Sequence, residues 1–136
     1  MTASLAWASD NQKTNHQNGV ALAGYDAVAY FQQAKAVPGN VDINSEWNGV
    51  SWQFSSQENK QLFIKNPQKF APQYGGFCAY AASKGALANV DPTAWTIHNE
   101  RLYLNFSHQV KEIWSQEKDQ NISKADQNWP ALSTSN

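Results

Sequence analysis

The stretch Trp95-Thr96-Ile97-His98-Asn99-Glu100-Arg101-Leu102-Tyr103-Leu104 decides the fold class. Residues on either side of Asn99-Glu100 alternate strictly, and a period of two is typical of a strand with one buried face. The two residues between the halves suit a tight hairpin turn, which sets His98 opposite Arg101. We therefore predict a hairpin whose apolar face is shared by Trp95, Ile97, Leu102 and Leu104, with His98, Arg101 and Tyr103 on the other face.

Two earlier regions predict further short strands. Residues 41–47 and 51–54 flank Asn48-Gly49, the dipeptide that most readily adopts the positive φ angles of a hairpin turn. Residues 20–24 predict a short strand that ends at a glycine turn. The strands of this chain are thus expected to be short and mainly antiparallel.

Helices are predicted between and after these strands. Asp26 is a good N-cap, so we expect a short helix over residues 27–33. A second helix is expected to begin near Phe77, directly after Gly75-Gly76, and to end at Gly85. From Ser107 onward the apolar spacing indicates a final helical region. Strands and helices together predict an α+β domain.

Ser55 and Glu58 form the S-x-x-E pattern of a capping box. The pattern predicts that Ser55 caps a helix from Ser56 to about residue 66, and Pro67 would end it. Leu62 and Phe63 are expected to supply the buried face of this helix.

Length and composition indicate one domain. The chain has 136 residues, of which 41% are hydrophobic, so it can bury a core without metal or disulfides. We expect a flexible arm over residues 1–18, the domain over residues 19–130 and a tail over residues 131–136. Ala6-Trp7-Ala8 has the small-x-small form of a signal peptidase site, although no complete signal peptide precedes it.

Charge, hydropathy and cysteine content exclude several classes. The net charge is −1 and the ten basic residues are scattered, so no nucleic-acid footprint is present. No apolar run approaches the length of a membrane-spanning helix, so we expect a soluble protein with no integral membrane segment. One cysteine cannot form an internal disulfide or a thiolate zinc cluster.

Several segments between Gly24 and Pro130 resemble the stand-alone YHS domain proteins of bacteria. The segments that carry the resemblance are Gly24-Tyr25-Asp26-Ala27-Val28-Ala29-Tyr30-Phe31, Trp52-Gln53-Phe54-Ser55-Ser56, Asn66-Pro67, Ala71-Pro72-Gln73-Tyr74-Gly75-Gly76-Phe77-Cys78-Ala79-Tyr80, Asp91-Pro92, Leu102-Tyr103-Leu104-Asn105 and Ala125-Asp126-Gln127-Asn128-Trp129-Pro130. The resemblance implies frequent export, hence a periplasmic or secreted protein, and a link to heavy-metal proteins. Some relatives look like selenoproteins with selenocysteine at the place of Cys78, which is suggestive of redox chemistry.

The chain departs from the YHS domains attached to metal-transport proteins. Those domains carry cysteines, natural ligands of soft metals, where this chain has Ala29 and Ser55. Copper or zinc binding therefore does not transfer with the resemblance.

Cys78 is the candidate redox thiol. We expect it in the first turn of a helix, where unpaired N–H groups and the helix dipole favour a thiolate. The alternative is a small buried hydrophobe, because free cysteine is among the most buried residue types. Both interpretations stay open on the sequence.

Two other sites are candidates. A small-ligand pocket beside Cys78 could be lined by aromatic, acidic and glycine residues of the motif segments, namely Tyr25, Asp26, Tyr30, Tyr74, Gly75, Gly76 and Tyr80. A copper or zinc site could combine Cys78, His98 and His108, but no H-x-x-x-H or C-x-x-C spacing supports it.

The sequence thus indicates an accessory protein of the bacterial envelope centred on Cys78, acting by thiol redox or by binding. A metal-binding module and a small-ligand-binding domain without chemistry are the alternatives. A redox partner or a small ligand would be the partner, and no motif of a classical enzyme is present.

Overall fold

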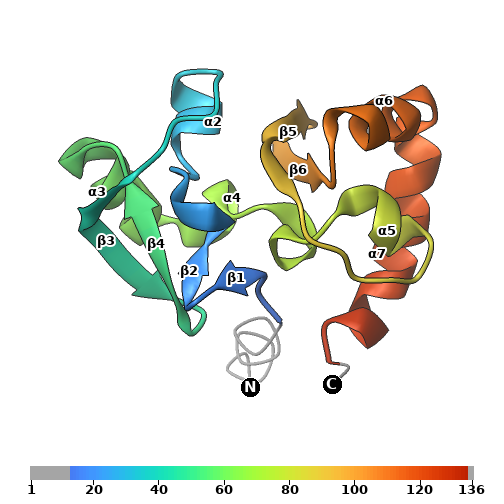
Figure 1. Ribbon diagram of the computed structural model, residues 1–136, viewed down its shortest axis with the longest axis horizontal. Coiled ribbons are helices and arrows are strands. Elements are labelled where there is room, and N and C mark those ends of the chain that lie inside the picture. Colours follow the sequence, from blue (N-terminus) through green and yellow to red (C-terminus); the bar gives the residue numbers. More distant parts are fainter. Residues whose placement is uncertain (1–12, 135–136) are drawn as a thin grey trace.

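The computed structural model describes residues 13–134 (Figure 1). The signal-peptidase-like Ala6-Trp7-Ala8 lies outside the described residues. The elements in chain order are β1 (His16–Gln17), β2 (Val20–Ala21), η1 (Leu22–Gly24), α2 (Ala29–Gln32), β3 (Asn40–Trp47), β4 (Val50–Phe54), α3 (Gln57–Lys65), α4 (Pro67–Phe70), η2 (Gln73–Gly76), α5 (Ala79–Ser83), β5 (Asp91–His98), β6 (Arg101–Asn105), α6 (His108–Gln116) and α7 (Lys118–Leu132). Helices and short, mainly antiparallel strands confirm the α+β class.

The predicted β5–β6 hairpin is confirmed in its register. His98 pairs with Arg101 and Ile97 with Leu102, around a turn in which Asn99 and Glu100 have φ angles of 52° and 66°. Leu102 and Leu104 are fully buried on one face, and Trp95 and Ile97 pack beside them partly buried.

The opposite face of this hairpin is also covered, which the alternating pattern did not predict. Tyr103 is only 2% exposed, and its ring lies 5.4 Å from that of Trp114 on α6. The hairpin therefore separates two clusters of side chains, and Figure 1 shows β5 and β6 between the sheet on one side and α5, α6 and α7 on the other.

The other sheet has the strand order β1-β2-β4-β3. The predicted hairpin of β3 and β4 is confirmed, with Asn48 and Gly49 both at positive φ in its turn. The strand predicted over residues 20–24 is shorter, because Leu22, Ala23 and Gly24 turn to positive φ and form η1. β2 pairs with β1 antiparallel and with β4 in parallel.

Regular structure extends past both predicted limits of the domain. β1 lies at His16–Gln17, within the predicted arm, and α7 continues to Leu132. Helix α2 covers Ala29–Gln32, within the predicted residues 27–33.

The predicted cap of α3 is wrong by one residue. The N-cap is Ser56, whose hydroxyl accepts a hydrogen bond from the Asn59 backbone N–H at 3.0 Å. Ser55 instead donates its hydroxyl to Asp26 at 2.7 Å. The predicted buried face is half right, since Phe63 is buried but Leu62 is 37% exposed.

Asp26 joins three elements of the sheet half. Its carboxylate is fully buried and accepts hydrogen bonds from the backbone N–H groups of Val28, Ala29 and Ser55 and from the side chains of Ser55 and Asn59. A buried carboxylate is stable only when such donors replace its water. Asp26 therefore accepts hydrogen bonds from the N–H groups at the start of α2, although the N-cap of this helix is Val28 and not Asp26 as predicted. Its other hydrogen bonds tie α2 to the end of β4 and to α3.

Candidate functional site

Cys78 is a helix cap inside the protein. The residue is 1% exposed and is the N-cap of α5, where its sulfur accepts a hydrogen bond from the Ala81 N–H at 3.5 Å. The prediction that it lies in the first turn of the helix is wrong, since the helix begins one residue later.

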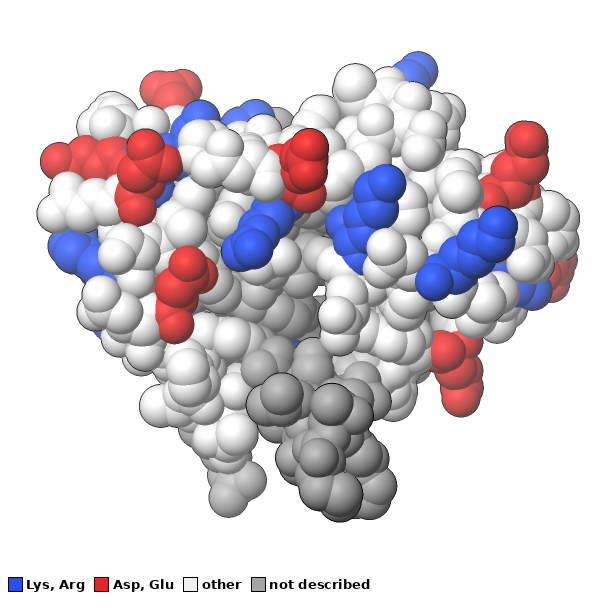
Figure 2. Space-filling model, turned by 180° about the vertical axis from the view of Figure 1, so that it is seen from behind, with Lys and Arg blue, Asp and Glu red and all other residues white. Residues whose placement is uncertain are grey.

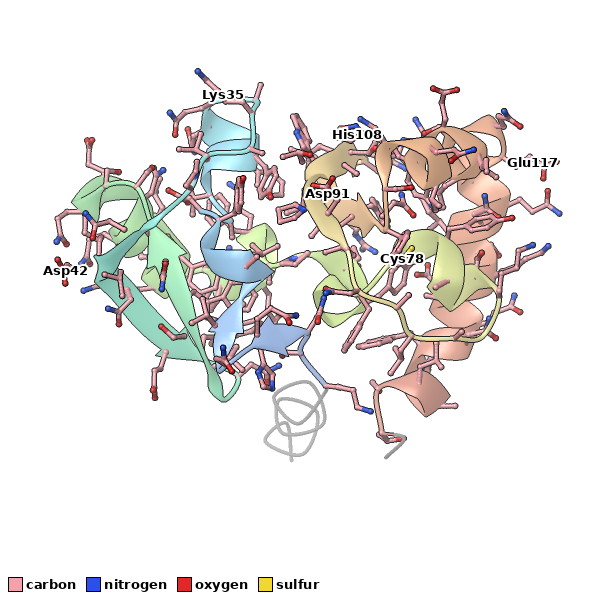
Figure 3. The ribbon with its side chains drawn as sticks, in the orientation of Figure 1. Lys35, Asp42, Cys78, Asp91, His108 and Glu117 are labelled. Atoms are coloured by element: carbon pink, nitrogen blue, oxygen red, sulfur yellow. The ribbon has the colours of Figure 1, made fainter. Side chains whose placement is uncertain are left out.

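Asn105 completes this cap. Its Oδ1 accepts a hydrogen bond from the Tyr80 N–H at 3.0 Å and another from the Cys78 thiol at 3.5 Å. Figure 3 shows the sulfur of Cys78 at the start of α5, among side chains inside the fold. The thiol thus packs and caps without contact with solvent.

The candidate metal set is wrong, because its members do not come together. His98 Nε2 lies 2.9 Å from Asp119 Oδ1 on α7, whereas His108 Nε2 lies 2.8 Å from Thr93 Oγ1. Within residues 13–134, no group of three or more His, Cys, Asp or Glu side chains could hold a metal ion. Figure 3 shows His108 near Asp91 and apart from Cys78.

The predicted pocket residues divide between the two clusters. Tyr25 packs against the first cluster, and Asp26 and Tyr30 are buried in the same half. The Tyr30 hydroxyl donates to the Pro92 carbonyl at 2.7 Å, and burial raises the pKa of Tyr30. Tyr80 packs against the second cluster with Lys84 over its ring. These residues hold the fold together and do not line one pocket.

Tyr74 and Gly75, by contrast, lie in the wall of an open groove of about 650 Å³. One wall is the tip of the β3–β4 hairpin, and the other is the β5–β6 turn with the C-terminal half of α7. The residues that line the groove are Lys13, Thr14, Trp47, Asn48, Trp52, Gln68, Lys69, Ala71, Pro72, Gln73, Tyr74, Gly75, Asn99, Glu100, Arg101, Asp126, Trp129 and Pro130.

Aromatic rings on both walls are held from behind. Trp47 meets the Phe63 ring edge-on at 5.8 Å and lies 5.7 Å from Trp52. On the other wall, the Trp129 ring packs against the Tyr74 ring, with the two centroids 6.1 Å apart. Trp47 and Trp129 remain half-buried, so each presents part of its ring to the groove.

Tyr74 is the most constrained of these residues. Its φ is 58°, a left-handed conformation that is unfavourable for an aromatic residue and that concentrates at functional sites. Its hydroxyl donates to Asp126 Oδ1 at 2.9 Å. Burial and this hydrogen bond raise the pKa of Tyr74 above its ordinary value.

Arg101 extends the polar side of the groove, and the buried Tyr103 packs against Tyr74, with the two ring centroids 5.9 Å apart. Burial raises the pKa of Tyr103 and the negative charge of Asp126 adds to this effect, whereas the charge of Arg101 and its hydrogen bond lower it. Arg101 and Asp126 are exposed at the groove, so opposite charges stand on one wall.

Residues 13–15 lie beside the groove, and Lys13 and Thr14 belong to its lining. The Lys13 N–H donates to the Ser133 carbonyl at 3.2 Å and the Asn15 N–H donates to the Gly75 carbonyl at 2.8 Å. Asn48 donates its side-chain amide to the Thr14 hydroxyl at 2.7 Å. The segment therefore connects α7, η2 and the β3–β4 turn.

Gly75 permits this arrangement because it has no side chain. A Cβ at Gly75 would lie 2.1 Å from the carbonyl oxygen of Lys13. The second glycine of the motif, Gly76, has a φ of 85° and is buried at the end of η2. Backbone geometry explains both glycines.

Most groove residues were not predicted from the sequence. Trp47, Lys69, Arg101 and Trp129 come from separate elements, and only the tertiary structure brings them together. The one local signal was the Tyr74-Gly75 dipeptide, which sits where the two halves of the chain join.

No family model matches the chain, and no curated protein or solved structure shows significant similarity to it. None of the helices within residues 13–134 combines the length and the apolar character needed to cross a membrane.

Proposed function

We propose that this protein is a small-ligand-binding domain and that the groove between its two hairpin turns is the binding site. The observation that carries the proposal is the convergence of aromatic rings and charged side chains from both halves of the chain on one open groove of about 650 Å³. Ligand sites of this size typically combine aromatic walls with a few fixed polar groups.

The shape of the groove wall is maintained at an energetic cost, which supports a role in binding. Tyr74 keeps a positive φ of 58° and directs its hydroxyl to Asp126. Such conformations persist only where the surrounding structure holds them. A preformed wall of this kind binds a ligand with less ordering of its side chains.

The buried Cys78 favours binding over thiol chemistry. A reactive cysteine needs an accessible sulfur, and this sulfur is 1% exposed and occupied as the cap of α5. The proposal therefore takes up the alternative of a binding domain without chemistry. Membership of the YHS family and location in the bacterial envelope are part of the proposal, and both rest on the sequence motifs.

A fragment screen by ligand-observed NMR tests the proposal. Gln68 is exposed at the groove, so Gln68→Trp should fill the groove and abolish binding of the fragments that the wild type binds. Gln109→Trp is the matched control, because Gln109 is exposed on α6 outside the groove. A set of fragments that binds both variants equally well would overturn the proposal.

A further inference from the structure

We infer that the ligand of the groove is a saccharide, an inference that rests on the proposed function. The aromatic rings on the walls are the first reason. The half-buried Trp47 and Trp129 present flat apolar surfaces from opposite walls, and each is held from behind by another ring. A sugar ring offers a flat apolar C–H face that packs on such a surface.

The polar groups are the second reason. Arg101 and Asp126 are exposed beside the rings, and each carries a planar group with two hydrogen-bonding atoms. Asp126 Oδ1 already accepts from the Tyr74 hydroxyl at 2.9 Å, which fixes the carboxylate. Neighbouring hydroxyls of a sugar match such fixed pairs of donors and acceptors.

The charge of the groove disfavours phosphate-rich ligands. Lys13, Lys69 and Arg101 stand with Glu100 and Asp126, so opposite charges largely cancel. Helix α7 contributes Asp126 and Trp129 from its C-terminal half, where the helix dipole repels anions. Figure 2 shows acidic and basic side chains interspersed on the face that it presents.

The backbone of the walls disfavours an extended peptide. The groove meets the two hairpins at their turns, at Asn48 and Asn99, whereas strand addition pairs along the length of a free sheet edge. Of the strands β3 and β6, which have a free edge, only the terminal residues Trp47 and Arg101 line the groove. A polyhydroxylated ligand that packs on rings and bonds to side chains fits these walls better.

The test is a titration with a panel of neutral and acidic hexasaccharides, followed by tryptophan fluorescence and calorimetry. We expect saturable binding of at least one member. Asp126→Ala should weaken it about tenfold, the equivalent of ~1.4 kcal/mol, because it removes one fixed acceptor and releases the Tyr74 hydroxyl. Asp119→Ala should change the affinity less than about twofold, since Asp119 is an exposed carboxylate of the same helix that bonds a side chain outside the groove.

Tyr74→Phe supplies a second variant that retains the ring. It frees Asp126 from its intramolecular hydrogen bond and should alter saccharide affinity while the unfolding midpoint falls only slightly. Failure of every saccharide, while fragments still bind the groove and are lost in Gln68→Trp, would overturn the saccharide assignment alone. Failure of both saccharides and fragments would overturn the proposed function as well. Saccharide binding that is unchanged in Asp126→Ala would place the sugar elsewhere.

Discussion

Replacement of Gly75 by alanine should displace residues 13–15 from the groove. The new Cβ would lie 2.1 Å from the Lys13 carbonyl oxygen and 3.2 Å from the Lys13 carbonyl carbon and from a ring carbon of Trp129. Contact with a backbone atom at 2.1 Å cannot be relieved by a side-chain rotation. The segment or η2 must move, and the hydrogen bonds that hold the segment must then break.

The magnitude follows from two contributions. Alanine at a φ of 61° costs about 1 to 2 kcal/mol, as at any left-handed position. Displacement of the segment also removes the hydrogen bonds from Asn15 to Gly75, from Lys13 to Ser133 and from Asn48 to Thr14. At about 1 kcal/mol each, these add roughly 3 kcal/mol. We expect Gly75→Ala to lose about 4 to 5 kcal/mol of unfolding free energy.

Gly49→Ala is the matched control. Gly49 has a φ of 82° and nothing lies within 4 Å of the site where its Cβ would be, so only the first contribution applies. Urea unfolding of the two variants measures the difference, and hydrogen exchange of the Asn15 amide reports release of the segment. Equal losses for Gly75→Ala and Gly49→Ala would refute the close approach of Lys13.

Four further predictions each concern one side chain and its hydrogen bonds. Asp26→Asn should lose about 3 kcal/mol or more of unfolding free energy, because the new side-chain NH₂ group would face the N–H and O–H donors that now bind the carboxylate. An unchanged urea midpoint would contradict this role of the carboxylate. Ser56→Ala should lose about 1 kcal/mol of unfolding free energy, because it removes the N-cap of α3. An unchanged unfolding free energy would show that Ser56 is not the cap. Cys78 should react with iodoacetamide roughly a hundredfold or more slowly in the native protein than in urea, because its sulfur is buried. Equal rates in the two conditions would show that the thiol is reactive in the native protein. Thr93→Val should raise the pKa of Asp91, measured by NMR, because hydrogen bonds from the Thr93 backbone and hydroxyl hold that pKa below its ordinary value. The stability that Asp91 adds is present above its ordinary pKa and is lost as the pH falls, so the variant should lose less on acidification; an unmoved pKa would exclude the hydroxyl as a cause.

Local patterns predicted the hairpins well, because their signal lies within a few residues. Asn99-Glu100 and Asn48-Gly49 both adopt the expected positive φ angles, and the register around each turn follows. The burial of Tyr103 could not be predicted in the same way. It depends on Trp114, which packs on the second face of the hairpin only once α6 is in place.

The misplaced cap of α3 shows how tertiary contacts select between equal local choices. Ser55 and Ser56 are both good caps, and the capping-box pattern favoured Ser55. Asp26 takes the Ser55 hydroxyl, which leaves Ser56 for the helix. Nothing near residue 55 in the sequence announces that contact.

The sequence predicted only two residues of the candidate site, Tyr74 and Gly75. Tyr74 and Gly75 belong to a motif segment and do line the groove, but Asp26 and Tyr30 in the other motif segment serve the core. Arg101 and Trp129 carry no pattern that separates a groove residue from a surface or core residue.

The most direct test of the account is chemical-shift mapping of the ¹⁵N-labelled protein with the tightest binder from the fragment and saccharide screens. We expect the largest shifts at the indole N–H signals of Trp47 and Trp129 and at the Gly75 amide, all of which belong to the groove. The chemical shift of the Ala81 amide, which donates its N–H to the buried sulfur of Cys78, should stay unchanged. Shifts centred on Ala81, with the two indole signals unchanged, would contradict the placement of the site in the groove.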